Sequence, residues 1–361
     1  MIKDLVPREI RDLSAYRPPE GGFGIRLDAN ESPFPLPPDV QTKVDSAFRQ
    51  VLSNRYPDPS SRRPREAFSC LFGCGPEEVL AGNGSDELIS LILWTFRNTR
   101  DTSRPRILIP VPTFSMYSIA ARAAGYDVAG VPLQRDLTLD RAAFLSEIAG
   151  TDPGIIFLSN PNNPTGSFFG KEDIDAILGA SRGLVVVDEA YGDFSEENSW
   201  ASRIGDYGNL AVLRTLSKVG AAALRCGFLV ANPSLIGEIN KVRSPFNVNA
   251  FTQAAAEVIL EEFTGIREQI STVVKERVRV AGILKECGLE VFPSRANFLF
   301  VRAGDREEAL WTFLKLHDIV VKFIAGNQVT GDALRVTIGT RAQNDMLAEK
   351  VKDFFREGDR G

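Results

Sequence analysis

Residues 184–191 read LVVVDEAY, four apolar residues followed directly by two carboxylates. A β-branched run of this kind is typical of a strand that is buried on both of its faces. Carboxylates buried at the end of such a strand are costly unless they are paired. We therefore expect at least one of Asp188 and Glu189 to contact a cation.

The same pattern recurs on both sides of this stretch. Apolar strand candidates occupy residues 79–84, 106–112, 128–131, 154–161 and 210–217. Helical spacing of apolar residues is found between them, in residues 85–98, 118–125 and 171–182. Apolar strands that alternate with helices predict a parallel sheet covered on both faces, which is an α/β architecture.

Near residue 245 the pattern changes. Residues 250–287 predict a long helical stretch, and strands are expected within residues 289–303, 318–324 and 334–340. We therefore predict three units. They are an N-terminal arm (1–40) that packs on the small domain or on a partner subunit, a large domain (41–245) and a smaller α+β domain (246–361). Proline removes a backbone donor, so the proline-rich arm is expected to be extended rather than a packed element.

Composition excludes several function classes. The chain has 361 residues and a formal charge of −5, so it has no general attraction to nucleic acid or to an anionic membrane. The single histidine, His317, is expected at a helix-to-strand junction in a solvated or capping role. Catalytic triads could rest only on this residue, and multi-histidine metal sites are excluded.

Cysteine usage and the N-terminal sequence indicate the compartment. The four cysteines lack a metal-binding spacing, so we expect no metal site and reduced core thiols, as in a cytoplasmic protein: Cys70, Cys74, Cys226 and Cys287. The first 19 residues are charged throughout, which is unlike a signal peptide, and no run approaches the roughly 20 apolar residues of a membrane span.

Polar motifs follow several of the predicted strands, where ligands gather in an open parallel sheet. Residues 82–87 read GNGSDE and open a helix, which favours an anion, although Ser85 could simply be the helix N-cap. Residues 160–166 read NPNNPTG, a sequence that also suits an ordinary loop. Ser217 and Arg225 offer an anion site, and Lys218 between them offers a nucleophilic amine.

One ligand satisfies these groups together. It needs a phosphate for the anion site, an aldehyde for Lys218 and a basic ring nitrogen for Asp188. Pyridoxal 5′-phosphate has all three, and its protein sites combine a lysine with an acidic partner of the ring nitrogen. The residues therefore predict pyridoxal phosphate as the cofactor.

The motifs also carry a family resemblance. DANESPF, RYPDPSS, GNGSDELI, PTFSMYS, NPNNPTG, VVVDEAY, RTLSK, LRCGF and LRVTIGT occur in the order seen in fold type I pyridoxal-phosphate aminotransferases, and most resemble the histidinol-phosphate aminotransferases. The resemblance runs from about residue 26 to residue 350. It implies a large domain with a mostly parallel seven-stranded sheet, a smaller α+β C-terminal domain and an N-terminal arm.

The resemblance implies a role for each matching residue. Lys218 is similar to the Schiff-base lysine that also moves the substrate proton, and Asp188 to the partner of the ring nitrogen. Asn163 and the catalytic Tyr191 match the partners of the ring 3′-oxygen, and Phe114 matches an aromatic ring stacked on the cofactor. The resemblance also implies a cradle for the cofactor phosphate, formed by Gly84, Ser85, Asp86, Ser217 and Arg225. It further implies that Tyr56 reaches the cofactor of a neighbouring subunit. A homodimer with shared active sites follows.

The substrate side is implied in the same way. Arg335 resembles the arginine that grips the anionic end of the substrate, and Asn30 matches a substrate-side position, although an Asx-turn is its alternative role. Tyr56 is expected to contact substrate as well. Relatives often carry an arginine where this chain has Lys322, which keeps the charge but loses the bidentate geometry. Residues 219–224 are one residue shorter than the common version, which could shift Arg225.

The implied reaction transfers the amino group of L-histidinol phosphate to 2-oxoglutarate, giving imidazole acetol phosphate and glutamate for histidine biosynthesis. Two alternatives share the fold: transamination of aromatic amino acids, and decarboxylation of threonine phosphate by a lyase. A non-catalytic ligand-sensing module of a regulator is disfavoured, because the chain has no spare basic helix-turn-helix segment and every expected catalytic position is filled.

Overall fold

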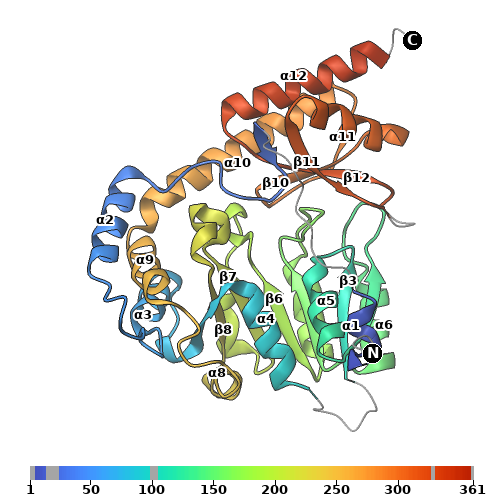
Figure 1. The fold of residues 1–361 in the computed structure, drawn as a ribbon. Helices are drawn as coiled ribbons and strands as arrows, with labels where there is room; N and C mark the ends of the chain where they lie inside the picture. Colours follow the sequence, from blue (N-terminus) through green and yellow to red (C-terminus); the bar gives the residue numbers. More distant parts are fainter. Residues whose placement is uncertain (1–4, 14–23, 98–104, 327–329, 359–361) are drawn as a thin grey trace.

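Two β-sheets organise the protein in a computed structural model that describes residues 5–13, 24–97, 105–326 and 330–358 (Figure 1). The larger sheet has seven strands in the order β2-β8-β7-β6-β5-β3-β4. Its strands are β2 (Val79–Asn83), β3 (Arg106–Val111), β4 (Asp127–Pro132), β5 (Ile155–Ser159), β6 (Leu184–Asp188), β7 (Leu210–Thr215) and β8 (Cys226–Ala231). Strand β8 runs opposite to the other six strands of this sheet, so the prediction of a mostly parallel seven-stranded sheet is confirmed.

The large sheet is buried on both faces, as its apolar strands predict. Alternate residues of β6 enter two separate cores, Val185 and Val187 on one face and Leu184 and Val186 on the other. The helices of this part of the chain are α2 (Pro38–Arg49), α3 (Arg62–Phe72), α4 (Gly84–Thr95), α5 (Ser115–Ala123), α6 (Arg141–Thr151), α7 (Lys171–Ala180), α8 (Pro233–Asn240) and α9 (Ala250–Glu261). The two-core arrangement is the expected consequence of the period-two alternation along a strand.

The smaller sheet has five strands in the order β1-β11-β12-β10-β9. They are β1 (Ile25–Leu27), β9 (Glu290–Val291), β10 (Phe298–Arg302), β11 (Ile319–Ile324) and β12 (Ala333–Thr337). The long helix α10 (Phe263–Glu286) and α11 (Glu307–Leu316) pack against this sheet. Helix α12 (Arg341–Gly358) packs on these two helices, as Figure 1 shows in orange and red. The expected helix over residues 250–287 is in fact two helices, because α9 ends at Glu261 and α10 begins at Phe263.

The N-terminal segment differs in part from the extended arm that was predicted. A short helix, α1 (Arg8–Arg11), precedes β1, and β1 pairs in parallel with β11 at the edge of the small sheet. Ile25 and Leu27 are buried, so this stretch is a packed element. The predicted arm also includes residues 1–4 and 14–23, which lie outside the described residues.

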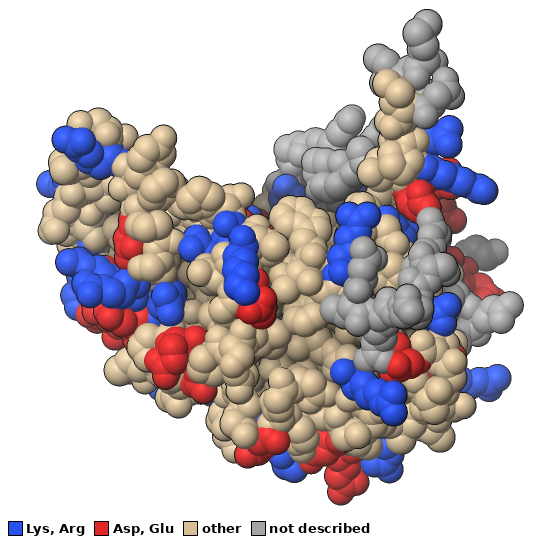
Figure 2. All heavy atoms as spheres, turned by 90° about the horizontal axis from the view of Figure 1, so that it is seen from below, with Lys and Arg blue, Asp and Glu red and all other residues tan. Residues whose placement is uncertain are grey.

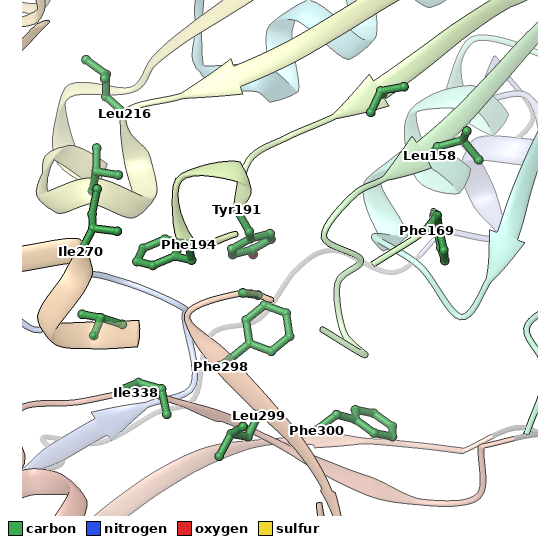
Figure 3. Close-up of a cluster of buried hydrophobic side chains, with 14 of the residues drawn as sticks. Leu158, Phe169, Tyr191, Phe194, Leu216, Ile270, Phe298, Leu299, Phe300 and Ile338 are labelled. Carbon is green, nitrogen blue, oxygen red and sulfur yellow. The ribbon is translucent and has the colours of Figure 1, made fainter. Parts of the chain in front are cut away.

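A shared apolar core joins the two sheets, and Figure 3 shows it between the carboxyl ends of the large-sheet strands and the small sheet. The ring of Tyr191 meets the edge of Phe298 from β10, with their centroids 5.1 Å apart. Phe194, which follows β6 in the chain, and Ile270, which lies on α10, belong to the same core. The region that follows β6 is therefore held against the smaller sheet.

The molecular surface, the helices, the cysteines and the single histidine add four observations. On the face seen in Figure 2, positive and negative side chains are interspersed over the described residues. Within the same residues, no helix is long and apolar enough to cross a membrane. All four cysteines are free, but the expectation of core thiols is wrong for Cys70, which is exposed. His317 follows the last residue of α11 as its C-cap, as expected.

Candidate active site

A pocket lies where the carboxyl ends of the parallel strands meet. It is lined by Ser85, Asp86, Phe114, Ser159, Asn163, Asp188, Ala190, Tyr191, Thr215, Ser217, Lys218 and Arg225. Its cavity volume is about 80 Å³. Because β8 is antiparallel, its first residues lie at this same edge, and Arg225 immediately precedes it.

The chain also reverses its direction across the sheet near this pocket. From β3 it passes to β4 on one side, and it returns to β5 on the other side before continuing to β6 and β7. Such a switch point leaves a crevice at the carboxyl ends of the strands, where ligands bind in open α/β sheets. The position of the pocket therefore follows from the topology.

Lys218 extends from a tight turn after β7. The hydroxyl of Thr215 donates to the backbone oxygen of Cys226 and accepts the backbone N–H of Ser217, at 3.0 and 3.1 Å. The Nζ atom of Lys218 lies 5.7 Å from the ring centre of Tyr191. These contacts hold the amine in the pocket rather than on an open surface.

Asp188 ends β6 and is almost completely buried, with 3% of its surface exposed. Its Oδ1 atom accepts the backbone N–H of Ala190 at 3.0 Å, and Oδ2 accepts the hydroxyl of Tyr117 at 2.6 Å. Burial raises the pKa of this carboxyl to about 6, although both hydrogen bonds oppose the shift. A carboxylate in this position is suited to bind a cationic ring nitrogen.

The second carboxylate of the motif meets the cation that was expected. Glu189 is buried and accepts Nη1 of Arg214 at 3.0 Å, and Nη2 of Arg214 binds Asp193 at 2.5 Å. The backbone N–H of Trp200 also donates to Glu189, at 2.7 Å. This buried cluster anchors the loop that carries Asp188 and Tyr191.

An anion cradle is formed where α4 begins. Arg225 donates to Ser217 Oγ at 3.3 Å and binds the carboxylate of Asp86 at 3.0 Å. Gly84 has a φ of +78°, and a Cβ atom there would stand 2.7 Å from the guanidinium of Arg225. Ser85 is not the N-cap, because α4 already begins at Gly84. The free N–H groups of this first helical turn point to the binding of an anion.

Asn30 connects the N-terminal segment to the pocket. It is buried, and its side chain donates to the hydroxyl of Tyr191 at 2.9 Å and accepts the hydroxyl of Thr337 at 3.0 Å. Its φ of 55° lies in the left-handed region that asparagine tolerates. Its backbone oxygen accepts Asn297 at 3.0 Å. The residue is therefore fixed between the small sheet and the loop that follows β6.

Arg335, on β12, reaches the pocket from the small sheet. Its Nη1 atom donates to Asn163 Oδ1 at 2.6 Å, and Nη2 donates to the backbone oxygen of Asp28 at 2.5 Å. Lys322 on β11 is the cross-strand partner of Arg335, so both side chains lie on the same face of the small sheet. Lys322 is exposed and does not line the pocket.

Tyr56 also lies outside the pocket of its own chain. Its side chain is 81% exposed, and its ring stacks on Phe246 with centroids 4.5 Å apart. The structure thus brings most of the expected residues together, attaches Asn30 and Arg335 to them, and leaves Lys322 and Tyr56 apart. Sequence reasoning gave no role to Tyr117, although the residue lies in the quoted motif PTFSMYS, residues 112–118.

The donor set of this pocket fits the expected pyridoxal phosphate. It combines a primary amine, a buried carboxylate and a cradle whose glycine leaves room beside an arginine. The described residues contain no group of three or more histidine, cysteine, aspartate or glutamate side chains that could hold a metal ion. The pocket is therefore suited to an anionic, aldehyde-bearing ligand.

Comparison with known proteins leads to the same chemistry. A histidinol-phosphate aminotransferase 2 from Cupriavidus pinatubonensis is 38% identical over 97% of this chain and 96% of its own. A histidinol-phosphate aminotransferase 2 from Nitrosococcus oceani is 39% identical over 98% and 99%. The crystal structure of the histidinol-phosphate aminotransferase from Clostridium acetobutylicum has 25% identity, covers 92% of this chain and 99% of its own, and superposes with a TM-score of 0.84. The model of the aminotransferase class I and II family matches residues 24–351, and the chain belongs to that family.

Proposed function

We propose that this aminotransferase uses pyridoxal 5′-phosphate to transfer the amino group of L-histidinol phosphate to 2-oxoglutarate. The products are imidazole acetol phosphate and glutamate, a step of histidine biosynthesis. The observation that carries the proposal is the meeting of Lys218, the buried Asp188 and the Arg225 cradle in one pocket beneath Arg335. Relatives named for this reaction, with 37–39% identity over nearly the whole chain, support the choice of substrate.

Different pocket residues would bind different parts of the cofactor. The backbone N–H groups at the start of α4, with Ser217 and Arg225, would hold its phosphate. Asp188 would pair with the ring nitrogen, and Asn163 and Tyr191 would bind the 3′-oxygen. Phe114 would stack on the ring. When bound, pyridoxal phosphate supplies an aldehyde that condenses with amines and a ring that accepts electrons from the substrate carbon.

The protein's own groups then direct the proton and the substrate. The Nζ atom of Lys218 would carry the proton that leaves the substrate carbon, acting as general base and then as general acid. Arg335 would bind the anionic end of the substrate, which requires its present bond to Asn163 to be replaced or shared. Lys322, on the same face of the small sheet as Arg335, would add a second positive charge.

The decisive experiment mixes the purified protein with L-histidinol phosphate and 2-oxoglutarate and measures glutamate. Glutamate should form with the wild type and not with K218A, which removes the amine. Phenylalanine as the better donor would favour an aromatic aminotransferase instead. Carbon dioxide released from threonine phosphate without an oxo-acid acceptor would favour a lyase. Absence of glutamate with every donor would refute the proposed activity.

A homodimer with shared active sites is part of the proposal. Tyr56 lies outside the pocket of its own chain, is exposed and stacks on the exposed ring of Phe246. Its side chain is therefore available to the pocket of a second subunit. Mixing inactive K218A with a weakened Y56A variant should restore activity in heterodimers, because one of the two sites would then be complete. Activity no greater than that of Y56A alone would contradict shared sites.

We place the enzyme in the cytoplasm. Its four cysteines are free, as is usual in a reducing compartment. Fractionation of cells that express the full chain would test this placement, and recovery in a membrane or secreted fraction would contradict it.

A further inference from the structure

Tyr117 is a buried tyrosine whose hydroxyl touches the active site. It lies on α5 with none of its surface exposed, and its hydroxyl donates to Asp188 Oδ2 at 2.6 Å. A length of about 2.5–2.7 Å is typical of a hydroxyl bound to an ionised carboxylate, and such bonds are roughly twice as strong as neutral ones. Tyr117 is therefore more than a core aromatic.

The ring of Tyr117 is held on two sides. It stacks on Phe157 of β5 with centroids 4.8 Å apart and an interplanar angle of 9°. Phe114 meets it edge-on, with centroids 5.5 Å apart and an angle of 87°. The residue thus joins the aromatic ring expected to stack on the cofactor to the carboxylate expected to bind its nitrogen.

The charge of Asp188 depends on few groups. Burial raises its pKa, the hydrogen bonds from Tyr117 and Ala190 lower it, and the charges of Asp86 and Glu189 raise it again. The pKa of Tyr117 is raised well above 10, mainly by burial and secondly by the charge of Asp188, so its hydroxyl remains a proton donor. The other ionisable groups that line the pocket are Tyr191, Lys218 and Arg225.

We propose that Tyr117 is a positioning residue of this active site. Its hydroxyl fixes Oδ2 of Asp188 and holds the buried carboxylate in its ionised form, aimed at a protonated ring nitrogen. The inference rests on the proposed function only for the role of Asp188 toward the cofactor. The geometry that carries it, the Tyr117–Asp188 bond and the two ring contacts, belongs to the chain itself.

The test follows the titration of Asp188 in the full-length protein labelled with ¹³C at the aspartate carboxyl carbons, with D188N to assign the signal. Y117F keeps the ring and its stacking but removes the hydroxyl, so the midpoint should rise by about one to two pH units. Y126F is the matched control, because Tyr126 is buried in the same core and donates to the backbone oxygen of Leu93 at 2.7 Å, away from Asp188. Its midpoint should equal that of the wild type.

Two further measurements do not depend on that titration alone. In the wild type, the hydroxyl proton of Tyr117 should give a slowly exchanging NMR signal that shifts at the midpoint of Asp188, even if Y117F folds poorly. Y117F should also bind pyridoxal phosphate roughly tenfold more weakly than Y126F, the size expected for one bond to a charged group.

An unchanged titration midpoint of Asp188 in Y117F overturns the inference. So does a Tyr117 hydroxyl signal that does not shift when Asp188 titrates, or a cofactor affinity of Y117F equal to that of Y126F. None of these readouts involves an amino donor. If the midpoint shifts but histidinol phosphate is not converted, the proposed substrate is wrong and the role of Tyr117 stands.

Discussion

Substitution of Arg214 by methionine should lower the free energy of unfolding by about 3–5 kcal/mol at pH 7, because it leaves buried carboxylates without their cation. The side chains of Arg214 and Glu189 are each 5% exposed, and that of Asp193 is 13% exposed. Methionine retains much of the apolar contact with Phe72, whose ring lies 4.5 Å from the guanidinium carbon. The loss therefore reports on charge rather than on packing.

Arg203 provides the matched comparison. It also binds two carboxylates, those of Asp175 and Asp206 at 2.6 and 3.1 Å, but its side chain is 24% exposed. Solvent screens such pairs, so R203M should cost no more than about 1 kcal/mol. Urea unfolding followed by circular dichroism measures both variants under the same conditions.

The double variant R214M/E189Q should recover part of the loss at pH 7, because it removes one of the two buried charges that R214M leaves unpaired. A loss as small as that of R203M, or a double variant no more stable than R214M, would refute this reasoning.

Three other outcomes are expected. G227A should destabilise the protein by about 1–3 kcal/mol in urea unfolding and weaken phosphate binding, because the added Cβ would stand 2.7 Å from the backbone of Gly84. G179A is the control: its added Cβ would have no neighbour within 4 Å, so it should be neutral or stabilising in the same assay. R335K should raise KM for the anionic substrate more than it lowers kcat, since lysine cannot form the two-pronged bond, and steady-state kinetics would contradict this if KM did not change. The pKa of Asp188 is raised to about 6, so the free energy of unfolding of the cofactor-free protein should fall as the pH rises through 6. D188N lacks this carboxyl, and its unfolding free energy should not show that decrease.

The large sheet was predictable because its central strands are continuous apolar runs. β5, β6 and β7 are fully buried along their length, and each ends in the polar motif that marked it. The site followed from the same rule, since parallel strands bring Ser159, Asp188 and Thr215 to one edge.

Other features depended on contacts that no local pattern records. β8 was not among the predicted strands, because its first residues read as part of a motif and its antiparallel direction is set by β2 and β7. β1 has three residues, which is too few for a periodicity. The bonds that Asn30 makes to Tyr191 and Thr337 join distant parts of the chain. Tyr117 lies in the motif PTFSMYS, but its contact with Asp188 joins two separate elements and cannot be read from that motif.

The pairing of β1 with β11 constrains how the protein matures during synthesis. Asn30 and its partner Thr337 are 307 residues apart in the chain. At about 5–20 residues per second, the ribosome needs roughly 15–60 s to produce that length. During this interval the nascent N-terminal strand, with Ile25 and Leu27, has no template to join. Completion of the catalytic pocket is therefore a late event in synthesis, and the strand has no pairing partner in the small sheet until then.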